Sequence, residues 1–194
     1  MLFSPDVFFT EITKEKENII WPFIIAMLGG IGMIVSSVFH TVSYHPDSLD
    51  SALKIFLFSI SFQYVFVVPL LMWAVVSVTI YAVSKVFSGT GSLIATFRNT
   101  GYGMLPMNLY GLGFYLLATG AFIAFGEIPG YTDNPVSRMM NVLNVIGLAF
   151  VFWSGYLWVV GTEKSCNLPR KTAMIPVACA VLLGCVVTLL WFTY

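Results

Sequence analysis

The sequence predicts an all-α protein, a polytopic membrane bundle of five transmembrane helices, and three observations support this fold class. Hydrophobic residues make up 58% of the 194 residues and charged residues only 9%, whereas about a quarter of residues are charged in ordinary soluble domains. The charged residues leave five uncharged runs between them, and about 20 helical residues are enough to cross a hydrocarbon core. Backbone groups in lipid must be satisfied within each segment, so these runs are expected to be helices.

The predicted organisation is an N-terminal segment at residues 1–18 followed by a five-helix transmembrane domain at residues 19–194. The expected spans are residues 19–39, 63–86, 103–126, 139–162 and 172–193.

The segment at residues 1–18 is expected to stay on the protein as a short helix on the cytoplasmic membrane surface. Ser4, Pro5 and Asp6 are typical of a helix start, with a capping hydroxyl, a proline in the first turn and an acid near the positive end. Phe8 and Ile12, four residues apart, would share its apolar face. A structural role and a partner-binding role are both open for this helix.

The second run is too long for one straight span, since residues 51–87 would form a helix of about 55 Å. We therefore expect residues 53–61 to form a separate helix along the outer interface. Pro69 would then kink the start of the span at residues 63–86.

Basic residues predict the orientation, because cytoplasmic segments are enriched in lysine and arginine. Lys54 and Arg138 lie on one side of the five-span arrangement, and the remaining seven of the nine basic residues lie on the other. These seven are Lys14, Lys16, Lys85, Arg98, Lys164, Arg170 and Lys171. The N-terminus is therefore expected in the cytoplasm and the C-terminus outside.

Residues 88–110 combine glycine, proline, charge and aromatic residues between two uncharged runs, and we expect them to form a shaped turn that organises the bundle. The glycines of this turn are Gly89, Gly91, Gly101 and Gly103. Pro106 is expected to open the third span, Tyr102 to anchor the start of that span at the interface, and Asn108 to help organise it.

Lys85 and Arg98 are expected at the cytoplasmic face of this turn. Contact with anionic lipid headgroups, contact with a cytosolic protein, and simple orientation of the bundle all remain open for them.

The turn also carries a family resemblance. Gly101-Tyr102-x-x-Leu105-Pro106-Met107 resembles the Gly-Tyr-x-x-Leu-Pro-Met segment of the Yip1 domain family, and the Gly-Thr-Gly-Ser at 89–92 is similar to the family's preceding glycine loop. Residues 18–23 resemble a shortened first motif without its acid and glycine, and residues 170–176 look like the start of the family's last helix.

The resemblance implies a protein that acts by binding, as a scaffold in membrane organisation or trafficking, and not as an enzyme. Eukaryotic members meet Rab-type GTPases and carry a long cytosolic tail before the first span. This chain has only about eighteen residues there and looks more like the prokaryotic members, so GTPase binding is not expected and the cell membrane is the expected location. The expected partners are membrane lipids, another membrane protein or a second copy.

Composition and motifs indicate neither a cofactor nor a catalytic site. The net charge of +0 gives no reason to expect nucleic acid, and apart from Lys85 at the end of the second span the predicted spans contain no ionisable side chain of the kind that proton pathways use. His40, His45, Asp47 and Asp50 lie close in sequence, but their spacing is not a recognised ligand motif, so no metal site is expected. The spacing of the three cysteines indicates neither a metal site nor a disulfide framework.

Polar and small residues inside the spans are expected to pack helices together. Asn141 and Asn144 share a helix face and are expected to hydrogen-bond between helices. Three small-x3-small pairs favour close helix packing, either within the chain or with another copy. These pairs are Ala26 and Gly30, Gly120 and Ala124, and Ala180 and Gly184.

The alternative function is a small transporter or channel built from helices broken at Pro69, Pro106 and Pro176, since interrupted helices mark many transport sites. A lipid-modifying enzyme ranks last, because no set of acid, base and nucleophile stands near the membrane.

Overall fold

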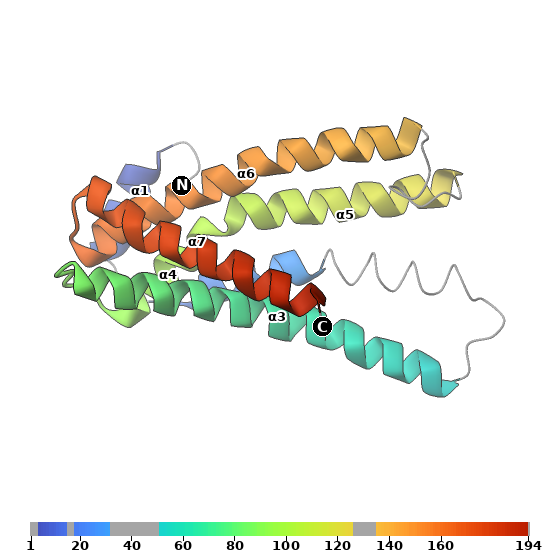
Figure 1. Ribbon diagram of the computed structural model, residues 1–194, viewed down its shortest axis with the longest axis horizontal. Coiled ribbons are helices and arrows are strands. Elements are labelled where there is room, and N and C mark those ends of the chain that lie inside the picture. The colour runs from blue at the N-terminus through green and yellow to red at the C-terminus, as the bar shows by residue number, and fades with distance from the viewer. Residues whose placement is uncertain (1–3, 15–17, 32–50, 126–134, 194) are drawn as a thin grey trace.

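The computed structural model describes residues 4–14, 18–31, 51–125 and 135–193, and within them all regular structure is helical. The all-α prediction is thus confirmed for these residues. The labelled helices are α1 (Pro5–Lys14), α3 (Ser51–Val86), α4 (Leu93–Gly103), α5 (Leu105–Phe125), α6 (Pro135–Cys166) and α7 (Arg170–Thr193) (Figure 1). A further helix, Ile20–Ile31, lies between α1 and α3 in the sequence.

The long helices form two antiparallel pairs, α3 with α7 and α5 with α6, and α6 also packs against α7 (Figure 1). α3 and α6 run toward one end of the molecule, and α5 and α7 run away from it. α1, α4 and the connections 87–92 and 167–169 gather at this end, which we call the α4 end. α1 packs on α6, and α4 lies between α3 and α6.

Two segments of the described residues are long and apolar enough to cross a membrane, Val67–Val86 and Asn141–Cys166. They correspond to the second and fourth predicted spans. Ile20–Ile31 is a shorter apolar helix, and the rest of the first predicted span lies outside the described residues.

The helix predicted separately at residues 53–61 is not separate, so that prediction is wrong. α3 runs without a break for 36 residues, with Pro69 inside it. No glycine or proline stands between Ser51 and Pro69 to end the helix, and a proline removes only one backbone hydrogen bond.

α3 and α6 end in the same way at the α4 end. Ser88 (φ 63°) and Asn167 (φ 59°) take the left-handed conformation just after the two helices. The Gly89 N–H then donates to the Ser84 carbonyl at 2.8 Å, and the Leu168 N–H donates to the Glu163 carbonyl at 3.3 Å. This bond pattern is the Schellman motif, which satisfies carbonyl groups left over at a helix end.

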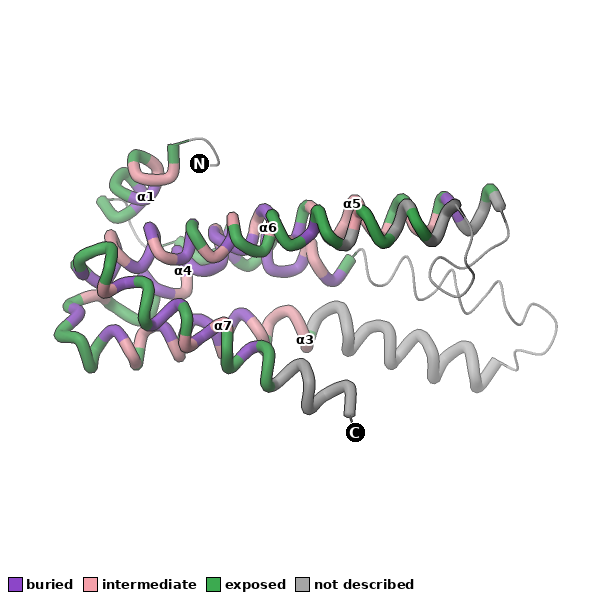
Figure 2. The backbone as a smooth tube through the Cα atoms, turned by 45° about the horizontal axis from the view of Figure 1, so that its top comes forward, coloured by how far each residue is buried: buried purple, intermediate pink, exposed green. Residues whose placement is uncertain are grey.

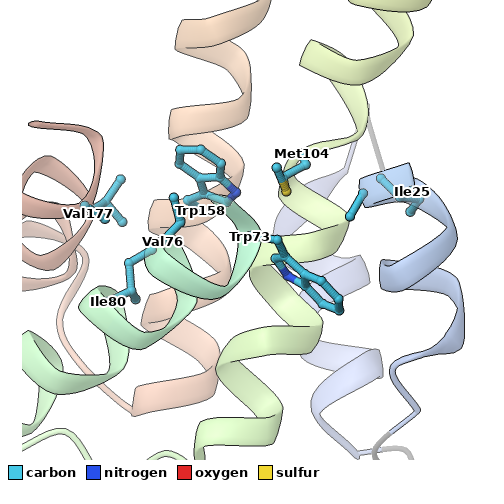
Figure 3. Close-up of a cluster of buried hydrophobic side chains, with 9 residues drawn as sticks. Ile25, Trp73, Val76, Ile80, Met104, Trp158 and Val177 are labelled. Atoms are coloured by element: carbon cyan, nitrogen blue, oxygen red, sulfur yellow. The ribbon is translucent and has the colours of Figure 1, made fainter. Parts of the chain in front are cut away.

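The main hydrophobic core lies where α3, α4, α6, α7 and the helix Ile20–Ile31 meet (Figure 3). Figure 2 shows buried residues concentrated in this region, with exposed residues along the outer faces of the long helices. Many of these exposed residues are large and apolar, among them Phe152 on α6 and Leu182 on α7. An apolar exterior of this kind is what a lipid-facing surface requires.

Candidate functional site at one end of the bundle

α4 is the main difference between the expected turn and the structure, because the segment after residue 92 is helical. Ser92 caps this helix: its backbone is extended (φ −88°, ψ 155°) and its Oγ accepts from the Ala95 N–H at 3.0 Å. Met104 alone separates α4 from α5, and Pro106 lies in the first turn of α5. Pro106 therefore opens the helix of the third predicted span, as expected.

Thr100 joins α4 to helices on both sides. Its carbonyl accepts from the Trp158 Nε1–H of α6 at 2.9 Å, and its Oγ1 lies 2.6 Å from the Ser77 Oγ of α3. The Trp73 Nε1–H of α3 donates to the Phe97 carbonyl at 3.0 Å. Ser77 and Thr100 are fully buried, so these hydrogen bonds replace water and fix the spacing of three helices.

Two asparagines tie further elements to this centre. The Asn99 Nδ2–H donates to the Gly161 carbonyl of α6 at 3.0 Å, and the Asn108 Nδ2–H of α5 donates to the Ile25 carbonyl at 2.7 Å. Asn108 was predicted to be an organising residue, and it joins α5 to the helix Ile20–Ile31. A Cβ at Gly29 would stand 2.7 Å from the Asn108 Oδ1, so this contact needs a glycine there.

The four glycines of the predicted turn all lie at close contacts. A Cβ at Gly89 would stand 2.8 Å from the Ser84 carbonyl oxygen, and one at Gly91 only 2.2 Å from the Ser165 carbonyl oxygen. At Gly101 and Gly103 the nearest atoms, of Pro22 and Trp158, would be 2.5 and 2.3 Å away. The Thr90 N–H also donates to the Cys166 carbonyl at 2.9 Å. The glycines therefore let the 87–92 connection approach α6 closely, and let α4 approach both α6 and the helix Ile20–Ile31.

The structure separates the other predicted contact residues. Lys85 is exposed, and its ammonium lies 5.2 Å from the centre of the Tyr81 ring. Arg98 is only 3% exposed, because α4 turns this face into the bundle, so Arg98 is not placed for the lipid or protein contact that the sequence left open for it. Tyr102 is half-buried, and its ring meets the Phe8 ring edge-on at 5.2 Å.

α1 lies on α6 with Phe9 and Ile12 buried. Phe9 packs against Leu157 and Val160, and its ring would lie 3.3 Å from a Cβ at Gly161. Ile12 of the predicted face is thus buried, whereas Phe8 is half-buried and Phe9 is the more deeply buried phenylalanine. The apolar side of α1 contacts protein in the structure.

An exposed group of four charged residues also holds α1, and the sequence reasoning missed it. The Arg170 Nε–H donates to the Glu163 Oε2 at 2.5 Å, and the Arg170 Nη2–H donates to Asp6. Lys164 lies 3.1 Å from Glu163 and 3.9 Å from Asp6. The hydrogen bond to Glu163, more than any other cause, raises the pKa of Arg170 above its ordinary value. Asp6 is far in sequence from its three partners, so no local motif indicates this group.

Among the described residues, no group of three or more His, Cys, Asp or Glu side chains could hold a metal ion. His40, His45, Asp47, Asp50 and the side chain of Asn144 lie outside the described residues, and Asn141 is exposed. The described α4 end combines exposed charged side chains such as Lys85 and Lys171 with the hydrogen-bonded helix α4.

The small-x3-small pairs differ in their surroundings. Ala26, Gly30, Ala180 and Gly184 are buried, as close packing within the chain predicts. Gly120 is exposed, and a Cβ there would meet nothing within 4 Å.

Comparison with known proteins agrees with the resemblance of the turn. The chain is 26% identical over 107 residues to an uncharacterized protein of Methanocaldococcus jannaschii, an alignment that covers 54% of this chain and 76% of the relative. No solved structure matches the chain. The family model of the Yip1 domain matches residues 1–192. This match spans nearly all of the sequence, and the chain therefore belongs to the Yip1 domain family.

Proposed function

We propose that this protein is a five-span scaffold of the cell membrane that binds membrane partners at the α4 end and does not catalyse a reaction. Membership of the Yip1 family and the apolar helices indicate a membrane protein with a trafficking-related role. The five spans, the cytoplasmic N-terminus and the scaffold role are our proposal.

The alternating direction of the helices supports this topology. α3 and α6 lead into the α4 end, while α5 and α7 lead away from it, so the connections between them fall on one side (Figure 1). Lys85, Lys164, Arg170 and Lys171 all lie in or beside these connections. A basic end of this kind is expected at the cytoplasmic face.

The observation that carries the binding role is the buried position of α4. A helix whose Thr100 and Asn99 side chains are hydrogen-bonded to α3 and α6 makes a firm base, and the neighbouring charged side chains remain accessible around it. Preorganised surfaces lose less entropy when a partner binds. Membrane lipids, another membrane protein and a second copy are the partners that such an end would accept.

The transporter alternative has less support. It depends on broken helices, and both α3 and α7 continue through Pro69 and Pro176. In the described residues the break near a proline lies at Met104, between α4 and α5, where the Thr100 carbonyl accepts from the Trp158 Nε1–H and the Asn108 Nδ2–H donates to the Ile25 carbonyl. An interrupted helix around an open polar site is therefore not what these segments form.

The proposal is tested by photo-crosslinking in native membranes from Lys85 and Lys171, with Leu182 on the outer face of α7 as the matched control. We expect defined protein or lipid adducts from the two lysine positions that do not appear from Leu182. Purified protein in vesicles should show no solute flux. Identical adducts from all three positions, or flux of a labelled solute through the purified protein, would contradict the scaffold role.

A further inference from the structure

The Asp6 group, which consists of Asp6, Glu163, Lys164 and Arg170, joins three helices through one carboxylate oxygen. The Arg170 Nη2 and the Lys164 Nζ both approach the Asp6 Oδ1, the first from α7 and the second from the end of α6. Glu163 binds the Nε side of Arg170 and also contacts Lys164. Two cations from different helices are thus oriented by Glu163 and converge on Asp6.

Charge balance shows what Asp6 contributes. Lys164 and Arg170 carry two positive charges and Glu163 one negative charge, so a net charge of +1 remains for Asp6 to neutralise. The side chains of Arg170, Asp6 and Lys164 are 42, 46 and 29% exposed, so another anion can reach them from solvent. A phosphate oxygen is an equally suitable acceptor for a guanidinium and an ammonium group.

The position of the group indicates which phosphate would reach it. Lys164 follows the predicted span 139–162 by two residues, and Arg170 precedes the predicted span 172–193 by two residues. Lys171, which is exposed, adds a further positive charge beside them. Residues at this depth lie among lipid headgroups, where anionic lipids attract basic side chains.

α1 has a second surface to which it can move when Asp6 is displaced. Phe8, Phe9 and Ile12 form its apolar side, which packs on α6 and Tyr102, while Glu11 and Lys14 are exposed. A helix with one apolar and one charged side can lie in the headgroup layer. Release from α6 therefore does not leave this apolar side in water.

We propose that Lys164 and Arg170 form a phosphate-binding pair at which the headgroup of an anionic phospholipid competes with Asp6, and that this competition controls the docking of α1 on α6. The inference rests on the proposed function in one respect, the placement of the α4 end at the headgroups. In a neutral membrane Asp6 occupies the pair and α1 is docked. In an anionic membrane a lipid phosphate takes its place, and α1 spends more time released.

The test is hydrogen exchange of the peptide that covers Pro5–Lys14, measured on the full chain in lipid nanodiscs. One set of discs contains only phosphatidylcholine, and the other also contains phosphatidylglycerol. We expect roughly fivefold faster exchange in the anionic discs, the effect of losing an exposed ion pair on a local opening equilibrium. Asp6→Asn should exchange fast in both kinds of disc, whereas Glu11→Gln, the matched control on the same helix, should still respond to the anionic lipid.

Several results would overturn the inference. Equal exchange of the wild-type α1 in the two kinds of disc would make the Asp6 group a structural contact only. An Asp6→Asn protein that still responds to phosphatidylglycerol would place the lipid effect elsewhere. If inorganic phosphate accelerates exchange in neutral discs and phosphatidylglycerol does not, the ligand is a free phosphate and the lipid mechanism is wrong.

This test is independent of the proposed sidedness, because nanodiscs present anionic lipid at both faces. Sidedness is measured separately by impermeant labelling of Lys171→Cys in sealed cells. A residue 171 reached from outside the cell would contradict the proposed topology and leave the exchange result intact.

Discussion

The indole nitrogen of Trp158 lies 2.9 Å from the Thr100 carbonyl oxygen and donates a hydrogen bond to it, across 58 residues of sequence. Both residues are buried. The bond joins the inner face of α6 to a helix that the sequence pattern did not reveal, and the consequences of losing it can be measured.

Replacing Trp158 by phenylalanine keeps most of the ring but removes the donor. The buried Thr100 carbonyl then loses this bond but still accepts from the Met104 N–H, so the expected cost is about 0.5–1.5 kcal/mol. Thermal unfolding of the purified protein in detergent should show a lower midpoint. Trp153→Phe, on the same helix but only half-buried, is the control and should shift the midpoint much less; equal shifts would mean that ring volume and not the hydrogen bond stabilises α4.

Gly103→Ala and Gly113→Ala are predicted to change the stability of the protein in opposite directions. A methyl group at Gly103 meets Trp158 at 2.3 Å, whereas one at Gly113 meets nothing within 4 Å. The first should destabilise the fold by roughly 1–3 kcal/mol through overpacking, and the second should stabilise its helix by about 0.5–1 kcal/mol. Unfolding midpoints measured side by side decide this, and a loss at both positions would show that Gly113 also packs against something.

Gly101→Leu and Lys85→Ala compare a change in packing with a change in charge. Gly101→Leu should reduce the yield of folded protein strongly, because the Cβ alone would stand 2.5 Å from Pro22. Lys85→Ala removes only an exposed side chain and should change stability by less than about 0.5 kcal/mol. Size-exclusion profiles after purification report both effects, and similar damage from the two changes would indicate that charge and not packing holds the turn.

Asn108→Ala should loosen the helix Ile20–Ile31 from α5. The change removes the donor to the Ile25 carbonyl and should cost about 1–3 kcal/mol. Faster hydrogen exchange in Ile20–Ile31 is the specific readout. Asn141→Ala, at an exposed position, should leave that exchange unchanged, and unaltered protection in Asn108→Ala would show that the hydrogen bond contributes little.

Phe9→Ala should release α1 without disturbing the rest of the bundle. Truncation of a fully buried phenylalanine costs about 3–5 kcal/mol, which exceeds what exposed ion pairs at Asp6 supply. Limited proteolysis should then cut within Pro5–Lys14 at least tenfold faster than in the wild type. Val7→Ala, on the exposed side of the helix, is the matched control, and resistance in both variants would mean that α1 is held mainly by other contacts.

The sequence predicted those features that depend on local pattern. Uncharged runs located the long helices, Ser4, Pro5 and Asp6 located the start of α1, and Pro106 located the start of α5. The four glycines of the predicted turn all lie at close contacts, although Gly101 and Gly103 lie within α4 and not in a turn.

Features that depend on distant partners were not predictable. Lys85 and Arg98 were both expected at the cytoplasmic face of the turn, and only the packing of α4 turns Arg98 inward. Ser92 before an apolar run is typical of a helix start. The helix that follows was not predicted, because Gly101 and Gly103 are typical of a turn. The pairing of Asp6 with Arg170 leaves no trace in a single sequence.

The hydrogen bond from Thr90 to Cys166, like the contacts of α4 with Trp158 and Gly161, has a consequence for biogenesis. The partners on α6 are synthesised after the segment that bonds to them, 58 residues later for Trp158 and 62 for Gly161, so α4 leaves the ribosome before these hydrogen bonds can form. These bonds can form only after α6 has been made. Chains that stall after α5 should therefore be recognised by quality-control proteases as unfinished.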